Sequence, residues 1–181
     1  IQNGLCPEDC GYCGQSKVSN APIKKYSFKD DDDIVRDAHE AKRRGVFRYC
    51  MVASGRGPTD SRVLQLARTI MRINDEVGIR TCLSVGMINK RQAEILKEAG
   101  LDRLNHNLNT SERHTPNIVT THEFKDRFET LVAAKEADLE LCSGIIAGMG
   151  ESDQDIVDVA YKLRSINVPS IPVNFLIPIP G

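Results

Sequence analysis

Short apolar segments alternate with longer amphipathic ones through most of the chain, and this order limits the possible fold more than any other feature. The apolar segments are partly β-branched and end at turn residues, as buried strands do. They cover residues 48–54, 80–86, 103–110, 139–148 and 171–180. Because parallel neighbours in a sheet need a helical connection, strict alternation predicts an α/β fold with parallel strands and right-handed crossovers.

The segments between the expected strands carry helix start and stop signals. The segment DDDDIVRDAHEAKRRG begins with acidic residues and ends with basic residues and Gly45, which suits both ends of the helix dipole. Thr59 or Asp60 is a suitable cap for the next helix and Gly78 a suitable stop. A later helix is expected to start at Thr121.

The order of elements fits either an open doubly wound sheet or a TIM-type barrel. No glycine-rich phosphate loop follows an expected strand, which argues against a dinucleotide-binding sheet. Polar residues follow several strands instead, and barrels place their sites at strand C-terminal ends. We expect residues 1–181 to form one domain, an incomplete TIM-type (β/α) barrel of roughly six βα units rather than the usual eight. Since a functional loop follows Ile1 directly and an apolar run precedes Gly181, we expect a fragment truncated at both ends.

Composition excludes several classes of protein. Lys and Arg (24) nearly balance Asp and Glu (25), and aromatic residues make up only 5%, so the sequence predicts no nucleic-acid partner. No apolar run has the length of a membrane span and no signal peptide opens the chain, so we expect a cytoplasmic protein with no membrane partner. The six cysteines could form three disulfides, but disulfide-stapled domains are usually smaller and secreted, which favours free thiols or metal ligation.

Three cysteines lie close together in CPEDCGYCGQS, at Cys6, Cys10 and Cys13. Three thiolates cannot complete a structural zinc site, which needs four protein ligands. A 4Fe-4S cluster held by three cysteines would instead leave one iron open to a substrate or cofactor. The alternative is a zinc site that borrows a distant ligand, such as Cys50 or one of the four histidines.

The other three cysteines, Cys50, Cys82 and Cys142, lie in three different expected strands. Alternation along a strand allows each side chain to point into the barrel. Cysteine also fills cores as a small apolar residue, so core packing is the simpler alternative. Thiolates that converge inside a barrel would hold a second metal centre, and an iron-sulfur site would then need a fourth ligand from outside this chain.

A row of amides marks the third expected strand. Asn105, Asn107 and Asn109 share one face at period 2, while His106 lies on the other face and is read as structural. Buried amides cost free energy unless they are hydrogen-bonded, so the row suggests a polar ligand. Asn174 is a fourth amide, within an apolar strand. A solvated turn or sheet edge is the alternative.

The spacing C-x3-C-x-aromatic-C resembles the signature of the radical SAM enzymes, and Tyr12 supplies the aromatic residue. Longer blocks resemble the biotin synthase family, in order and across nearly the whole chain. These blocks are CPEDCGYCGQS, YCMVASGRGP, TCLSVG, LNHNLNTS, IVTTHEF, LCSGIIAGMGE and IPVNFLIPIPG.

The resemblance implies two iron-sulfur clusters. The cluster that binds S-adenosylmethionine (SAM) would be a 4Fe-4S cluster on Cys6, Cys10 and Cys13. An auxiliary 2Fe-2S cluster, the sulfur donor, would be held by Cys50, Cys82 and Cys142. Its fourth ligand in the family is an arginine from a later strand, beyond Gly181, and Arg48 would lie near this cluster.

The resemblance also implies binding residues. Tyr12 and Ile146 would contact the adenine of SAM, Ala53 its amino group, and Asn107 and Asn109 its ribose. Dethiobiotin would be held by Asn105, Asn107 and Asn174. The family often has Asp where this sequence has Asn109, so we expect a weaker or altered contact with the ribose.

The implied reaction is sulfur insertion that converts dethiobiotin to biotin through a 5′-deoxyadenosyl radical. No side chain is assigned as catalytic, because the clusters and SAM carry the chemistry. A flavodoxin or ferredoxin would donate electrons, the full-length enzyme would be a homodimer, and the isolated fragment would be inactive. The alternatives are another radical SAM enzyme of related barrel type or, in a different class, a zinc-stabilised binding module.

Overall fold

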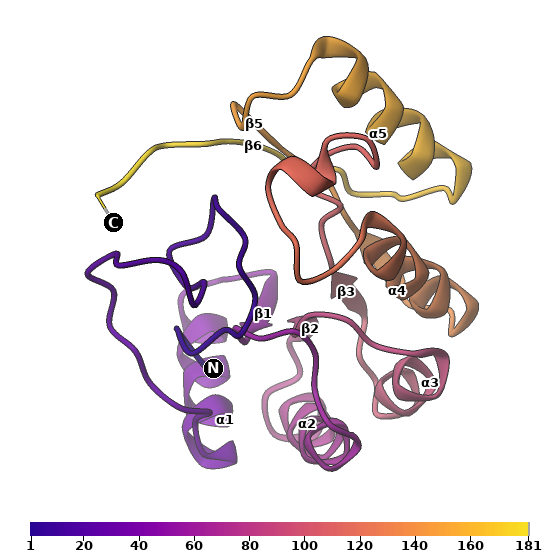
Figure 1. Ribbon diagram of the computed structural model, residues 1–181. Coiled ribbons are helices and arrows are strands. Elements are labelled where there is room, and N and C mark those ends of the chain that lie inside the picture. The colour runs from indigo at the N-terminus through magenta and orange to yellow at the C-terminus, as the bar shows by residue number, and fades with distance from the viewer. Residues whose placement is uncertain (181) are drawn as a thin grey trace.

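The computed structural model describes residues 1–180 and confirms an α/β fold with parallel strands (Figure 1). A π-helical turn, Ile73–Val77, extends the second helix, and a 3-10 turn covers Thr115–Asn117. The helices and strands are α1 (Asp31–Arg43), β1 (Arg48–Val52), α2 (Asp60–Arg72), β2 (Arg80–Ser84), α3 (Lys90–Glu98), β3 (Arg103–Asn105), α4 (Phe124–Glu136), β4 (Glu140–Cys142), β5 (Ile145–Ala147), α5 (Asp153–Ser165) and β6 (Val173–Phe175).

The strands form an incomplete barrel with the helices on its outside (Figure 1). Strands β1 to β4 pair in sequence order in one parallel sheet, and β5 pairs with β6 in a second. Two isolated bridges, Asn109 to Ile145 and Cys142 to Ser170, join the two sheets. Within residues 1–180 each of the five helices is followed by a strand, with β4 and β5 together after α4, against the roughly six βα units expected.

The fourth expected strand is broken in two, β4 and β5, at Ser143 and Gly144. Gly144 lies against the following crossover so closely that a Cβ atom there would stand 1.8 Å from the carbonyl oxygen of Pro172. The side chain of Ser143 accepts a hydrogen bond from the backbone N–H of Leu108 (3.2 Å). Both residues at the break therefore contact segments that are distant in the sequence.

A row of large apolar side chains crosses the sheet on the face that the helices cover. Met51, Leu83, Leu104 and Leu141 are partners in register on β1, β2, β3 and β4, and all four are buried. Burial of one such side chain contributes roughly 1.5–3 kcal/mol, so this row is a main source of stability. Strand alternation then directs the neighbouring positions, including the cysteine positions, toward the barrel interior.

Helix starts follow the local capping residues. Thr59 caps α2, where its side chain accepts from the N–H of Arg62, as the sequence suggests. The fourth helix starts at Phe124 rather than at Thr121, because Glu123 and Asp126 form a capping box there. Thr121 is thereby free to contact the N-terminal loop.

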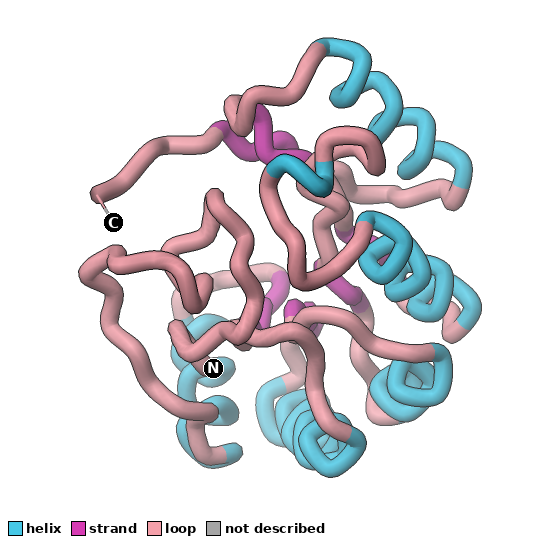
Figure 2. Tube along the Cα trace, viewed as in Figure 1, coloured by secondary structure: helices cyan, strands magenta, loops and turns pink. Residues whose placement is uncertain are grey.

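The first thirty residues form a long loop without helix (Figure 2). This loop contacts segments that follow strand C-terminal ends: Ser54 after β1 bonds to Gln2, and Ile118 beyond β3 bonds to Gly11. The loop therefore lies at the end of the barrel where such folds carry their sites. None of the helices in the described part of the chain is long and apolar enough to cross a membrane.

Candidate functional site

The three cysteines of the N-terminal loop are free thiols, with Cys10 buried and Cys6 and Cys13 half-buried. The loop turns back on itself: the N–H of Cys13 donates to the Cys10 carbonyl (3.1 Å), and that of Cys6 donates to the Gln15 carbonyl (3.3 Å). Burial raises the pKa of the Cys10 thiol to about 11. A metal that binds here must therefore displace a proton from a thiol that holds it firmly.

Glu8, between the first two cysteines, is only 5% exposed and ties the loop to the rest of the protein. Its carboxylate accepts from the Thr121 hydroxyl (2.6 Å), from Nδ1 of His122 and from the Arg56 guanidinium (3.2 Å). Burial by itself would raise the pKa of Glu8, but the hydrogen bonds from Thr121, His122 and Arg56 hold it below its usual value. Glu8 is therefore an ionised anchor.

Asp9 adds a second anchor on the same segment. Its carboxylate accepts from the backbone N–H of Thr120 (2.9 Å) and of Thr121 (3.2 Å) and from both hydroxyls. The hydrogen bonds from Thr120, then those from Thr121, lower the pKa of Asp9. Gly11 completes the attachment, because its N–H donates to the Ile118 carbonyl (2.9 Å).

Tyr12 and Asn109, two residues predicted to bind SAM, are in direct contact. Nδ2 of Asn109 donates to the Tyr12 hydroxyl oxygen (2.6 Å). Asn109 is buried and has a left-handed backbone (φ 71°), and its carbonyl accepts from the N–H of Ile146 (2.9 Å). Burial raises the pKa of Tyr12, so its hydroxyl stays protonated. The structure thus brings Tyr12, Asn109 and Ile146 together.

A pocket of about 240 Å³ lies between the cysteine loop and the C-terminal segment. Cys10, Tyr12 and Cys13 line one side, and Leu176 and Ile179 belong to the apolar residues of the other. A pocket with both polar and apolar lining next to two thiols suits an organic cofactor that also contacts a cluster held by those thiols.

Ala53, the remaining predicted SAM residue, lines a different pocket of about 320 Å³, together with Leu5, Pro7 and Ser54 from the loop and the end of β1. Its backbone bridges to Gln2. The structure therefore does not place Ala53 in the pocket that Tyr12 lines.

The predicted row of asparagines is not one regular strand, because β3 ends at Asn105. Oδ1 of Asn107 accepts from the N–H of Gly144 (3.0 Å), at the break between β4 and β5. Nδ2 of Asn105 lies 3.7 Å from the sulfur of Cys142, and Nδ2 of Asn174 donates to the Ile145 carbonyl (3.2 Å). Each amide thus has one protein contact, and the exposed Asn174 stands apart from the others on β6.

Two of the strand cysteines, Cys50 and Cys82, lie on the neighbouring strands β1 and β2, whereas Cys142 lies on β4, with β3 between them. Cys50 and Cys82 are partners in register, and Cys142 pairs with Asn105 one row further along the barrel. The pKa of the Cys50 thiol is lowered, first by a hydrogen bond with Cys82 and then by nearby Arg103. Within residues 1–180 no group of three His, Cys, Asp or Glu side chains is arranged to hold a single metal ion.

Two arginines lie beside the strand cysteines. Arg48 donates to one carboxylate oxygen of Glu140 (2.9 Å), and Arg103 donates to the other. The Nε atoms of both arginines are buried and have no hydrogen-bond partner among the described residues. Buried donors without partners are uncommon, so this wall fits an anionic group with acceptor atoms. An iron-sulfur cluster with thiolate and sulfide ligands has this chemistry.

Sequence reasoning missed Arg103, Glu140 and the contacts of Glu8. Arg103 could have been found, because it has the same strand parity as Asn105 and thus shares its face. The partners of Glu8 could not, since His122 lies 114 residues away and no local pattern links the two.

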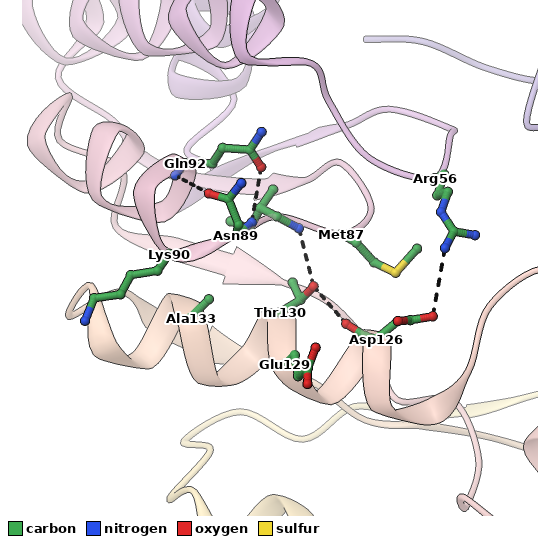
Figure 3. A pocket seen from close by; sticks show the side chains of 10 residues that line it. Arg56, Met87, Asn89, Lys90, Gln92, Asp126, Glu129, Thr130 and Ala133 are labelled. Atoms are coloured by element: carbon green, nitrogen blue, oxygen red, sulfur yellow. Dashed lines mark hydrogen bonds and ion pairs between the residues drawn. The ribbon is translucent and has the colours of Figure 1, made fainter.

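A separate pocket of about 470 Å³ lies between the start of α3 and the side of α4 that runs from Asp126 to Ala133 (Figure 3). Asn89 caps α3, and the N–H of Ile88 donates to Thr130 (3.3 Å). Arg56 lies 3.9 Å from Asp126 across this pocket while it also reaches Glu8. The pocket is lined by none of the predicted site residues.

Comparison with known proteins gives relatives over the full chain. Residues 3–163 match the radical SAM superfamily. The chain is 69% identical to the biotin synthase of Acaryochloris marina and 58% identical to that of Leptospira biflexa, over 100% of this chain and 52% of each relative. It thus spans about half the length of these curated relatives.

Solved structures share the fold at low sequence identity. A methylornithine synthase has a TM-score of 0.83 at 16% identity, over 96% of this chain and 51% of its own. The FeFe-hydrogenase maturase HydG from Carboxydothermus hydrogenoformans has a TM-score of 0.81 at 19% identity, over 96% of this chain and 43% of its own. These similarities support the partial barrel assignment.

Proposed function

The chain belongs to the radical SAM superfamily, and from this premise we propose that it is part of a biotin synthase, which inserts sulfur into dethiobiotin. The observation that carries the proposal is a second set of free cysteines in one sheet, Cys50 on β1, Cys82 on β2 and Cys142 on β4, beside two arginines whose Nε atoms are buried without a partner among the described residues. An auxiliary cluster would account for this second set, which the SAM-binding cluster alone would not.

Three residues of the N-terminal loop, Cys6, Cys10 and Cys13, would hold the 4Fe-4S cluster. When bound, this cluster supplies the electron that cleaves SAM and yields a 5′-deoxyadenosyl radical. The protein's part is to bind and orient SAM, with the pocket beside Cys10 and Tyr12 as the proposed site and Asn107, Asn109 and Ile146 as further proposed contacts. The apolar C-terminal segment helps to exclude water there. Ala53 lines a different pocket and stays a proposed contact of the amino group.

The strand cysteines would hold the 2Fe-2S cluster that donates sulfur. Arg48 and Arg103 would offset its negative charge, and their free Nε donors are available to its sulfur atoms. Glu140 holds both guanidinium groups in place. The fourth ligand is proposed to be an arginine outside residues 1–181.

Dethiobiotin would lie between the two clusters. Amides offer both donors and acceptors, which suits a urea group. Asn105 and Asn107 lie near Cys142 and near the β4–β5 break, so they are the better placed candidates, with Asn174 on β6 as a third. A flavodoxin or ferredoxin donor, a homodimer and a cytoplasmic location belong to the same proposal.

Anaerobic reconstitution of the full-length protein with iron and sulfide tests the proposal. We expect two clusters per chain by iron counting and electron paramagnetic resonance, and biotin from dethiobiotin and SAM. The triple variant of Cys50, Cys82 and Cys142 to Ala is the matched control, and it should keep the 4Fe-4S signal but make no biotin.

Other outcomes would contradict the proposal. Fewer than two clusters per chain in the unmodified protein would contradict the proposed function. Bound zinc without iron would favour a zinc-stabilised binding module. Cluster loading with SAM cleavage but no biotin would instead indicate another radical SAM reaction.

A further inference from the structure

A chain of hydrogen bonds crosses the site from the end of β3 to the cysteine loop. Nε of Arg127 donates to the Asn107 carbonyl (2.7 Å), and Nη1 of the same arginine lies 3.4 Å from Nε2 of His122. Nδ1 of His122 contacts the carboxylate of Glu8. We call these three side chains the Arg127–His122–Glu8 chain.

The neighbours of His122 determine which of its ring nitrogens donates a hydrogen bond and which accepts one. An ionised carboxylate only accepts hydrogen bonds, so Nδ1 of His122 must carry the proton that it donates to Glu8. A guanidinium only donates, so Nε2 must offer its lone pair to Arg127. A neutral imidazole satisfies both neighbours, and its burial (7% exposed) makes any loss of these partners costly.

The two ends of this chain belong to different parts of the site. Asn107 also fixes the backbone at the β4–β5 break through Gly144. Glu8 lies between Cys6 and Cys10, inside the cysteine loop. The chain therefore connects the segment with the proposed cofactor amides to the segment with the proposed cluster ligands.

We propose that His122 is a positioning residue that fixes the cysteine loop relative to the end of β3; the inference rests on the proposed function of that loop. Radical hydrogen transfer depends on the distance between donor and acceptor carbons, and a shift of about 1 Å in a bound reactant can cost on the order of 10²-fold in rate. A loosened loop would still cleave SAM, but fewer cleavage events would lead to product.

The test compares variants of His122 in the full-length protein. His122→Phe keeps the ring shape and removes both hydrogen bonds, while His122→Asn keeps a donor near the position of Nδ1. We expect His122→Phe to raise the ratio of 5′-deoxyadenosine to biotin about tenfold with iron content unchanged. This is less than the roughly 10²-fold loss of rate for a shift of about 1 Å, because Thr121 and Arg56 still hold Glu8. His122→Asn should restore part of the coupling, and His39→Phe on the exposed face of α1 should have no effect.

A second measurement needs no loaded cluster. Hydrogen exchange of the loop amides in the apo-protein, Gly11 above all, should become faster in His122→Phe, because the loop loses one anchor. If His122→Phe does not fold, Arg127→Met breaks the same chain from α4 and should show the same changes.

The results separate this inference from the proposed function. The positioning role would be overturned if His122→Phe showed the same ratio of 5′-deoxyadenosine to biotin and the same hydrogen exchange of the loop amides as the unmodified protein. Arg127→Met takes the place of His122→Phe in this comparison if His122→Phe does not fold. Absence of biotin in the unmodified protein would contradict the proposed function, and loop exchange would then decide the inference.

Discussion

At the scale of single residues, the site contains buried polar atoms whose partners come from distant parts of the chain. The contact between Asn109 and Tyr12 joins positions 97 residues apart. Asn109 could bond to a ribose hydroxyl only if its amide turned away from Tyr12 or used its oxygen. Tyr12 and a ribose hydroxyl would thus compete for the Asn109 amide, which is a physical reason to expect an altered ribose contact.

Tyr12→Phe should destabilise the apo-protein. The buried Nδ2 of Asn109 would lose its acceptor, and a buried donor without a partner costs about 1–3 kcal/mol of unfolding free energy. Chemical denaturation of the full-length protein measures this loss. Tyr26→Phe, at a half-buried tyrosine of the same loop, is the matched control, and an equal loss in both variants would contradict the prediction.

At the scale of elements, the break between β4 and β5 supplies hydrogen-bond partners to the segment that follows β3. The Gly144 N–H donates to Asn107, the Ser143 hydroxyl accepts from Leu108, and the Gly144 carbonyl accepts from Asn109. The sequence predicted one continuous strand over residues 139–148, because its apolar residues give no sign of a break. The close approach of Gly144 to Pro172 depends on where the next crossover returns. Only the tertiary structure shows that distance.

Gly144→Ala should disturb the pairing of β5 with β6. The added Cβ would overlap the Pro172 carbonyl, so the strands must separate, and overpacking of this kind costs roughly 1–3 kcal/mol or more. Thermal unfolding of the full-length protein checks this. Gly11→Ala is the control, since its nearest neighbour would be an ordinary 3.7 Å away, and similar melting of the two variants would argue against the steric explanation.

At the scale of the whole molecule, the order of strands and the inward position of Cys50 and Cys82 could be predicted from sequence, because both follow from local periodicity. The position of the N-terminal loop could not. Its contacts with residues 118–122 depend on charge and hydrogen-bond pairing between distant segments, for which Glu8 and Asp9 give no local sign. The pairing of Arg103 with Glu140 also joins distant segments, although strand parity alone could have placed Arg103 on the face of Asn105.

The incomplete barrel leaves β6 as an open edge with apolar side chains. Phe175 is 76% exposed and Val173 55% exposed. Exposed apolar edges pair with other strands, so residues 1–181 alone should self-associate as concentration rises. Val173→Lys should reduce this association in light scattering, whereas Tyr161→Lys on α5, also at an exposed side chain, should not. Equal effects of the two substitutions would mean that general surface polarity, rather than the strand edge, controls association.

The distant anchoring of the cysteine loop also sets a time at which the loop can take its shape. During synthesis the loop leaves the ribosome before its anchors, because Thr121 and His122 follow Glu8 by more than 110 residues. At about 5–20 residues per second, the nascent loop spends several seconds or more without its anchors. Iron and sulfide delivered in that interval would meet three thiols whose loop is not yet anchored, so assembly of the proposed cluster would be better timed after Thr121 and His122 have bound Glu8.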